Sequence, residues 1–78
     1  MEPIEVTARF SEDGTITVQH FAWNGVRYHL ESAGRQWTDD DGQHMLVMVA
    51  GGQIYELVFK GGEGRWYITK VRPEHTVL

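Results

Sequence analysis

The stretch Phe21-Ala22-Trp23-Asn24-Gly25-Val26-Arg27-Tyr28 decides the fold of this chain. Asn24-Gly25 supplies the two left-handed backbone positions of a type I′ turn, and aromatic and β-branched residues stand on both sides of it. The stretch therefore predicts a β-hairpin in which Trp23 pairs with Val26. Because side chains alternate between the two faces of a strand, one face carries the residues that we expect in the core, namely Phe21, Trp23, Val26, Tyr28 and Leu30.

Alternation of apolar and polar residues continues on both sides of this hairpin. It predicts strands over residues 4–10, 15–23, 26–32, 44–50, 53–59 and 65–72. Ile16 and Val18 have the wrong parity to share a face with Phe21, so we expect a β-bulge near Gln19 and His20. Residues 44–50 are apolar on both faces, which indicates a central strand or a strand at a barrel seam. Residues 33–43 are rich in Gly and Asp and are expected to form an irregular connection.

The length of 78 residues suits one domain, residues 1–78, with an ordered core over about residues 3–72 and a short C-terminal tail at 73–78. Pro73 should end the last strand, because proline cannot donate a hydrogen bond to the ladder. No segment has a convincing helical period. The sequence therefore predicts an all-β fold: a single small antiparallel six-stranded meander that curls into a partly open barrel or roll.

The composition excludes several classes of protein. A net charge of −4 without a basic stripe argues against unspecific binding to phosphate backbones, and the absence of cysteine excludes a disulfide scaffold and a cysteine nucleophile. No apolar run is long enough to cross a bilayer, and the first residues lack the features of a signal peptide. Neither Ser11 nor Ser32 has an adjacent histidine motif. We therefore expect a cytoplasmic, non-membrane protein without a cofactor, not an enzyme, that is a monomer or a weak homodimer.

Two histidines of the predicted hairpin face each other. The register places His20 directly across from His29, with Cβ atoms about 5 Å apart. Two imidazoles in this arrangement can bind a divalent metal if a third ligand, His44 or an aspartate of residues 39–41, joins them. The alternative is that both are surface histidines on a solvated face.

Trp37 is the residue that most clearly suggests binding to a partner. It lies in the expected irregular connection, outside any strand pattern, and it either plugs one end of the barrel or anchors a protein partner. Arg35 and Tyr67 are the other residues that we expect to contact a partner. An exposed strand edge would also allow an extended peptide to add as a further strand.

Weak binding of single-stranded nucleic acid is an alternative to binding a protein. Aromatic platforms along a basic groove bind single strands. The residues that would form such a track beside Tyr67 are Arg27, Arg65, Lys70 and Arg72. The track requires the third and sixth strands to share an outer face.

The order of three short motifs resembles a family of small uncharacterised bacterial all-β domains. The motifs are a Trp-x-Gly-x-x-Tyr hairpin at residues 23–28, Tyr-Glu-Leu at 55–57 and Gly-Arg-Trp at 64–66, with Trp37 between the first two. Members of that family look like stand-alone proteins or like C-terminal appendages of Y-family DNA-polymerase-like repair proteins. Here the middle segment contains Asp39-Asp40-Asp41, where the family is richer in Trp and basic residues, which argues against direct contact with DNA.

These observations favour a non-catalytic protein-interaction or adaptor module. The resemblance implies an association with DNA repair or damage tolerance, with a protein partner that the sequence does not identify. The alternatives that stay open are the nucleic-acid track and metal or small-ligand binding at His20 and His29.

Overall fold

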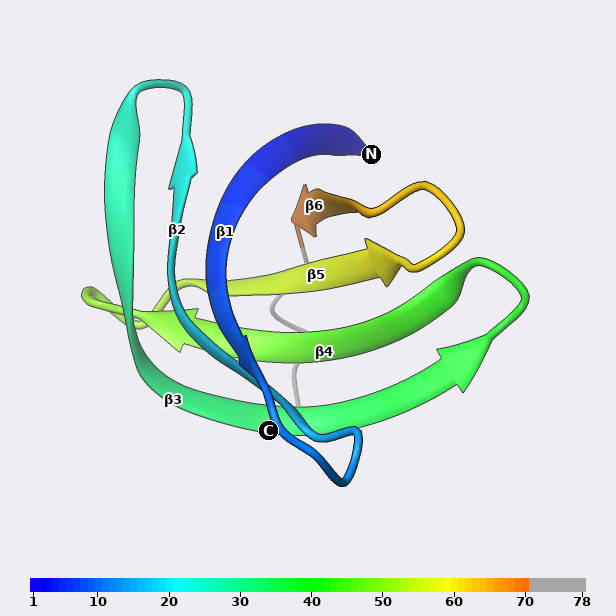
Figure 1. The fold of residues 1–78 in the computed structure, drawn as a ribbon. Helices are drawn as coiled ribbons and strands as arrows, with labels where there is room; N and C mark the ends of the chain where they lie inside the picture. The colour runs from blue at the N-terminus through cyan, green and yellow to red at the C-terminus, as the bar shows by residue number, and fades with distance from the viewer. Residues whose placement is uncertain (71–78) are drawn as a thin grey trace.

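The computed structural model describes residues 1–70 and forms a barrel of six β-strands. The strands are β1 (Glu2–Phe10), β2 (Ile16–Trp23), β3 (Val26–Asp39), β4 (Gly42–Val49), β5 (Ile54–Lys60) and β6 (Arg65–Lys70). Each strand pairs antiparallel with the next, and β1 also pairs with β6, so the sheet is closed (Figure 1). The prediction of an all-β, six-stranded antiparallel meander is therefore confirmed. The expected C-terminal tail at 73–78 lies outside the described residues.

The β2–β3 hairpin has the predicted register. Trp23 pairs with Val26, and Asn24 and Gly25 both have positive φ angles, of 53° and 77°. Phe21 is fully buried, and its ring stacks on Tyr28 with centroids 5.1 Å apart. The expectation that Val26 faces the core is wrong: its side chain is 50% exposed, because the hairpin projects beyond the end of the barrel (Figure 1).

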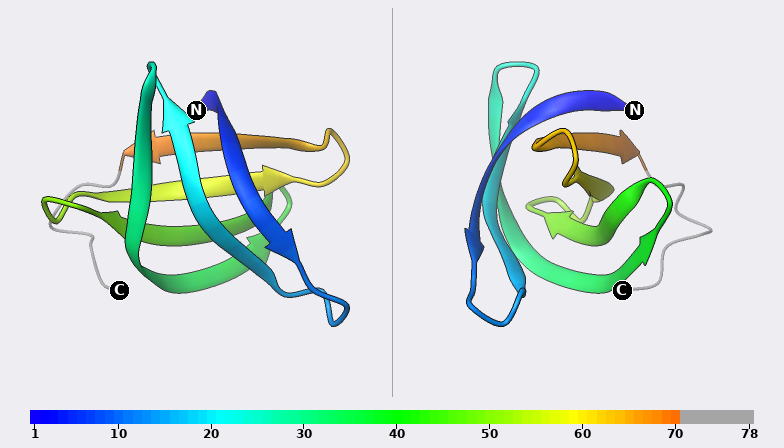
Figure 2. Two further views of the ribbon diagram at one scale, coloured as in Figure 1. Left: turned by 60° about the vertical axis from the view of Figure 1, so that its left-hand side comes forward. Right: turned by 45° about the vertical axis from the view of Figure 1, so that its right-hand side comes forward.

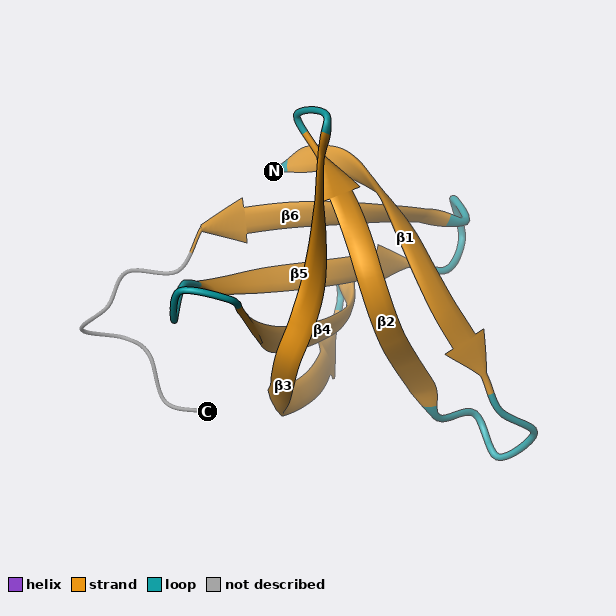
Figure 3. Cartoon of the chain, turned by 90° about the vertical axis from the view of Figure 1, so that its left-hand side faces the viewer, coloured by secondary structure: helices purple, strands orange, loops and turns teal. Residues whose placement is uncertain are grey.

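The predicted β-bulge is present in β2. Thr7 of β1 pairs with His20, but the next residue, Ala8, pairs with Val18, so Gln19 is the extra residue. The bulge changes the parity of the strand, which allows Val18 and Phe21 to be buried in the same core. The strands β2 and β3 lie side by side near their turn and diverge with increasing distance from it (Figure 3).

The expectation of an irregular connection over residues 33–43 is wrong. The third strand continues to Asp39, a turn follows at residues 40–41, and β4 begins at Gly42. Two register shifts, one between Leu30 and Ser32 and one between Ala33 and Gln36, accompany the strong curl of β3 (Figures 1 and 2). Most side chains of β3 are exposed, so the strand lacks the apolar alternation on which the sequence prediction depended.

Side chains from β2, β4, β5 and β6 dominate the fully buried interior. The buried cluster consists of Ile16, Val18, Phe21, Met45, Val47, Val49, Tyr55, Leu57, Trp66 and Ile68. The fourth strand lies between β3 and β5 and is buried on both faces, since His44 and Leu46 on its outer face are each 6% exposed. The prediction of a central strand there is confirmed. No helix in residues 1–70 could span a membrane.

Candidate functional site

A histidine bound by two carboxylates lies on the outer face of the barrel, near the β3–β4 turn. His44 is on β4, next to Met45, which belongs to the core cluster, so His44 points away from the interior. Its cross-strand partner on β5 is Val58, and Glu56 is two residues from Val58 on the same face. Asp39, the last residue of β3, approaches His44 from the other side. Three adjacent strands therefore position the three side chains.

The turn that carries Asp39 depends on a close backbone approach. Gly42 has a φ angle of +139°, and a Cβ atom at this position would lie only 2.4 Å from the carbonyl oxygen of Phe59. The backbone N–H of Asp41 donates a hydrogen bond to Oδ1 of Asp39 at 2.8 Å. Glycine therefore lets β4 start against β5, and the turn amide holds the carboxylate of Asp39 beside His44.

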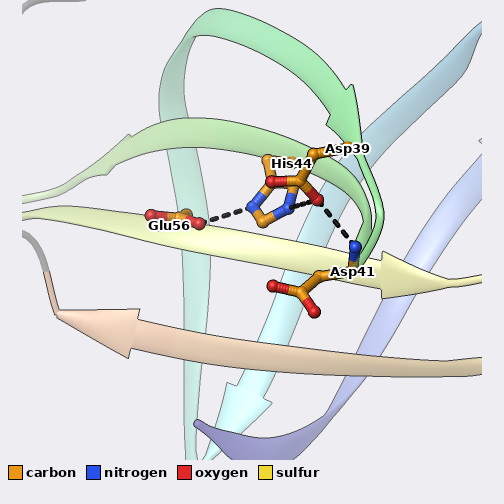
Figure 4. A network of polar contacts seen from close by, with 4 residues as sticks. All are labelled: Asp39, Asp41, His44 and Glu56. Carbon is orange, nitrogen blue, oxygen red and sulfur yellow. Dashed lines mark hydrogen bonds and ion pairs between the residues drawn. The ribbon is translucent and has the colours of Figure 1, made fainter.

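Both ring nitrogens of His44 contact a carboxylate oxygen. Nδ1 lies 2.6 Å from Oε2 of Glu56, and Nε2 lies 2.7 Å from Oδ1 of Asp39 (Figure 4). The His44 side chain is 7% exposed, whereas those of Glu56 and Asp39 are 23% and 47% exposed. A neutral imidazole has one N–H and can donate to only one carboxylate, while the imidazolium donates to both. The site is therefore built to hold a cation at the ring.

The pKa values of the site reflect these contacts. Burial alone would lower the pKa of His44, but the hydrogen bonds with Glu56 and Asp39 outweigh it, and the pKa lies above its ordinary value. The hydrogen bond with His44, followed by that from the Asp41 amide, lowers the pKa of the Asp39 carboxyl group. The arrangement favours a positive charge on the ring and a negative charge on Asp39.

Trp37 and Arg35 extend the site along β3. Trp37 pairs with His44 across the sheet, and the two rings stack with centroids 5.0 Å apart and an interplanar angle of 10°. The guanidinium carbon of Arg35 lies 5.3 Å from the centre of the Trp37 ring. Trp37 therefore lies half-buried on the outer face of β3 and not in an irregular connection. It is not part of the core cluster, so it does not plug the barrel, and its role as an anchor for a protein partner stays a prediction.

Tyr67 lies on the same outer face, two strands beyond His44. We call the four cross-strand neighbours the outer row: Trp37, His44, Val58 and Tyr67. The hydroxyl of Tyr67 donates a hydrogen bond to Glu63 at 2.6 Å, which raises the pKa of Tyr67. The ammonium group of Lys60 lies 5.1 Å from the centre of the Tyr67 ring. The three residues predicted to bind a partner, Trp37, Arg35 and Tyr67, thus share one face.

His20 and His29 pair as predicted, but no third ligand joins them among the described residues. Their ring centroids are 5.5 Å apart. In residues 1–70, the one group of three side chains with metal-ligand geometry contains Asp39, Asp41 and His44. The expectation that His44 or an aspartate of residues 39–41 completes a site at His20 and His29 is therefore wrong, because the β3–β4 turn gathers these residues into a cluster of their own.

The basic residues proposed for a nucleic-acid track are distributed over two hairpins. Arg27 is exposed and follows the β2–β3 turn, and Arg65 is exposed and begins β6 after the β5–β6 turn. Two intervening strands, β4 and β5, separate β3 from β6 in the sheet. Lys70 ends β6, and Arg72 lies outside the described residues. The nucleic-acid track stays a prediction.

Sequence reasoning missed the role of Glu56 and placed His44 with the wrong partners. Glu56 was visible as the polar residue between Tyr55 and Leu57, which is typical of any solvated strand face. The signal that could have identified it is the turn around Gly51 and Gly52, provided that it is read as a three-residue loop over residues 50–52. Val49 then lies opposite Gln53, and this register brings Glu56 to the diagonal of His44. The position of Asp39 beside His44 could have been predicted only if β3 had been recognised to continue through the polar stretch that ends at Asp39.

In three comparisons with known proteins, no family model, no curated protein and no solved structure matched this chain. The resemblance to the domains appended to Y-family polymerase-like proteins therefore stays a prediction.

Proposed function

We propose that this protein is a non-catalytic interaction module that binds an acidic segment of a protein partner along the outer row. The observation that carries the proposal is the presence of two partly buried aromatic rings on one face, each with a cation over it. Arg35 covers Trp37, and Lys60 covers Tyr67. Aromatic residues and arginine are the residue types enriched at the energetic centres of protein interfaces.

The spacing of the outer row suits an extended peptide. Trp37 and Tyr67 are three strand spacings apart, which corresponds to about 14 Å. An extended chain advances about 3.3 Å per residue, so a segment of about four residues crosses the row from one ring to the other. Such a segment can place one side chain near each ring, and contacts at the two ends of the row would carry the binding, because His44 and Val58 between them are buried.

The cations at the two ends of the outer row favour a partner that carries carboxylates. Among residues 1–69, the only ion pairs within 4.0 Å join His44 to Asp39 and to Glu56. The Glu63 carboxylate accepts the hydrogen bond of Tyr67. Most of the carboxylates near the row thus have partners within the chain, whereas Arg35 and Lys60 are available to the carboxylates of a ligand.

The packing of the interior supports a binding role without catalysis. Ten buried side chains form the core cluster, and neither of two surface hollows formed by described residues is lined by a histidine. One lies along residues 9–13, and the other is lined by Met1, Glu2, Trp23, Ile68 and Thr69. The resemblance noted above suggests that the partner acts in DNA repair or damage tolerance.

Selection of binding peptides from a random library, followed by fluorescence-anisotropy titration of the selected peptide, tests the proposal. We expect peptides with carboxylates next to an apolar residue. Arg35→Gln should weaken binding about tenfold, as expected for a charged contact at an interface. The matched control is Arg27→Gln, which removes an exposed arginine of the same strand at the other hairpin and should leave affinity unchanged.

Two results would overturn the proposal. One is equal loss of peptide binding in Arg35→Gln and Arg27→Gln. The other is selection of peptides without acidic residues. A labelled single-stranded oligonucleotide, titrated at low salt, provides the comparison with nucleic acid. Oligonucleotide binding that Arg27→Gln or Arg65→Gln abolishes, without peptide binding, would favour the nucleic-acid track instead.

A further inference from the structure

The two ring nitrogens of His44 have different partners. In the neutral ring that carries its proton on Nδ1, Glu56 accepts a hydrogen bond from Nδ1, the arrangement in which a metal-binding histidine commonly donates its other N–H to a carboxylate. Nε2 then directs its lone pair at Oδ1 of Asp39, 2.7 Å away. Two electron-rich atoms at this distance repel, so a cation must bridge them. That cation is either a proton or a metal ion.

Asp41 offers a third oxygen on the same turn. One ligand atom from each of Asp39, Asp41 and His44 lies within 4.8 Å of the other two. Ligands of a tetrahedral zinc ion, with bonds of about 2.0–2.1 Å, lie about 3.3 Å apart, so side-chain movements of about 1–2 Å would complete the site. Both aspartates are exposed, but Asp39 is already held beside His44 by the Asp41 amide, so the side chain of Asp41 would make most of this movement.

The imidazole of the site is oriented in advance. The ring of His44 is stacked on Trp37 and hydrogen-bonded to Glu56. A metal ion therefore meets a ligand whose orientation is set by neighbours that need not move. The side chain of Asp41 is the adjustable part of the site (Figure 4).

The charge around His44 also favours a divalent cation. Asp39, Asp41 and Glu56 together carry three negative charges, and the protonated ring would supply a single positive one. Within residues 1–69, the ion pairs of Asp39 and Glu56 are those with His44, and no arginine or lysine lies within 4.0 Å of these carboxylates. A divalent ion that replaces the Nε2 proton would reduce the excess of negative charge further than the proton does.

We propose that Asp39, Asp41 and His44 bind a divalent transition-metal ion such as Zn²⁺, with Glu56 as the residue that orients the imidazole. Imidazole and carboxylate ligands suit zinc and its neighbours in the series, whereas Mg²⁺ and Ca²⁺ take oxygen ligands. Three protein ligands leave a fourth position open to water. This inference goes beyond the proposed peptide-binding face and does not depend on it.

The experiment is a titration of chelator-treated, ¹⁵N-labelled protein with Zn²⁺ at neutral pH, followed by the NMR signals of the histidine rings. We expect saturation at one ion per chain, with the ring signals of His44 shifted and those of His20 and His29 unchanged. The pair His20 and His29 serves as an internal control, because the same sample contains both arrangements of histidine.

Asp41→Asn is the most informative variant. The side chain of Asp41 has no part in the hydrogen bonds of His44, and the amide that bonds to Asp39 belongs to the backbone, so the fold should be preserved. We expect at least about tenfold weaker zinc binding, and about 10- to 100-fold weaker binding for Glu56→Gln. The matched control is Asp40→Asn, which removes the same charge from the same turn and should change affinity less than about threefold.

Several outcomes would overturn the inference. The first is that the His44 signals do not shift at millimolar zinc, and the second is that only the signals of other histidines respond. The third is that Asp40→Asn and Asp41→Asn lose the same amount of zinc affinity. An equal response to Mg²⁺ or Ca²⁺ would also overturn it, because the imidazole would then not be a ligand. An unfolded Asp41→Asn variant would contradict the stated independence of that side chain, and Glu56→Gln would then carry the test of the site.

Discussion

The two ends of β3 form hairpins that are stabilised by different interactions. At the β2–β3 end, aromatic rings pack together, as Phe21 does with Tyr28 and Trp23 does with Tyr55. At the β3–β4 end, a buried imidazole bonds to two carboxylates, and a backbone oxygen approaches a glycine closely. One strand thus ends in an apolar cluster on one side and in a polar network on the other. The second arrangement tolerates less change, because each polar contact requires a specific atom in a specific place.

Substitution of one glycine at each end of β3 should give the largest difference in the free energy of unfolding between the two ends. Gly42→Ala places a Cβ atom 2.4 Å from the carbonyl oxygen of Phe59 in a backbone region that side chains rarely adopt. We expect a loss of about 3 kcal/mol or more in the free energy of unfolding, because strain and a backbone clash both contribute. Urea denaturation measures this loss.

Gly25→Ala is the matched variant in the other hairpin. Gly25 has a φ angle of +77°, but no atom lies within 4 Å of a Cβ at that position. Only the left-handed backbone conformation opposes the substitution, so we expect a loss of about 1–2 kcal/mol. Equal losses in the two variants would show that the close approach of Gly42 to β5 contributes nothing to stability.

Substitutions of the histidines near the two ends of β3 should also differ in their effect on the free energy of unfolding, but by less than the two glycine substitutions do. His44→Gln removes the ring that hydrogen-bonds to Glu56 and Asp39. Because hydrogen bonds to charged groups contribute about 1.5–3 kcal/mol, we expect a loss of about 1–3 kcal/mol in the free energy of unfolding in the presence of chelator. His29→Gln changes an exposed residue without a hydrogen bond to the described part of the chain, and it should change stability by less than about 0.5 kcal/mol. If thermal and urea denaturation gave the same stability for both variants, His44 would contribute no more than a surface histidine.

The same contrast explains what the sequence could predict. The register of the β2–β3 hairpin follows from Asn24-Gly25 and from local alternation, and even the bulge at Gln19 follows from the parity of Val18. These features depend on residues close together in the chain and on apolar side chains that must be buried. Local pattern therefore suffices for most of the barrel.

The site at the other end of β3 depends on residues from three strands. Asp39 and Glu56 bond to the same ring although they are 17 positions apart, and each alone is typical of a solvent-facing strand. The C-terminal half of β3 shows no apolar alternation. The length of the strand, and therefore the position of Asp39, could not be derived from the sequence. A polar cluster of this kind becomes predictable only once the pairing of β3, β4 and β5 is known.

The dependence of stability on pH is the smallest expected effect and tests the network most directly. The folded protein holds the pKa of His44 above the ordinary histidine value of about 6.5. The native state therefore binds more protons than the unfolded chain over the interval between these two pKa values. This contribution to stability is fully present below about pH 6.5 and is lost as the pH rises through the folded pKa.

Asp39 limits the contribution on the acid side. Its pKa is lowered in the folded protein, so its stabilising effect is present above the ordinary aspartate value of about 3.9 and is lost as the pH falls through the folded pKa. The difference in unfolding free energy between the wild type and His44→Gln, measured with chelator, should therefore be largest near pH 5–6 and should decrease toward pH 8. The other histidines are present in both proteins and cancel in the difference. If this difference in unfolding free energy stayed constant between about pH 5 and pH 8, folding would not favour the protonated ring. The two carboxylates would then contribute no net stabilisation to the positive charge of His44.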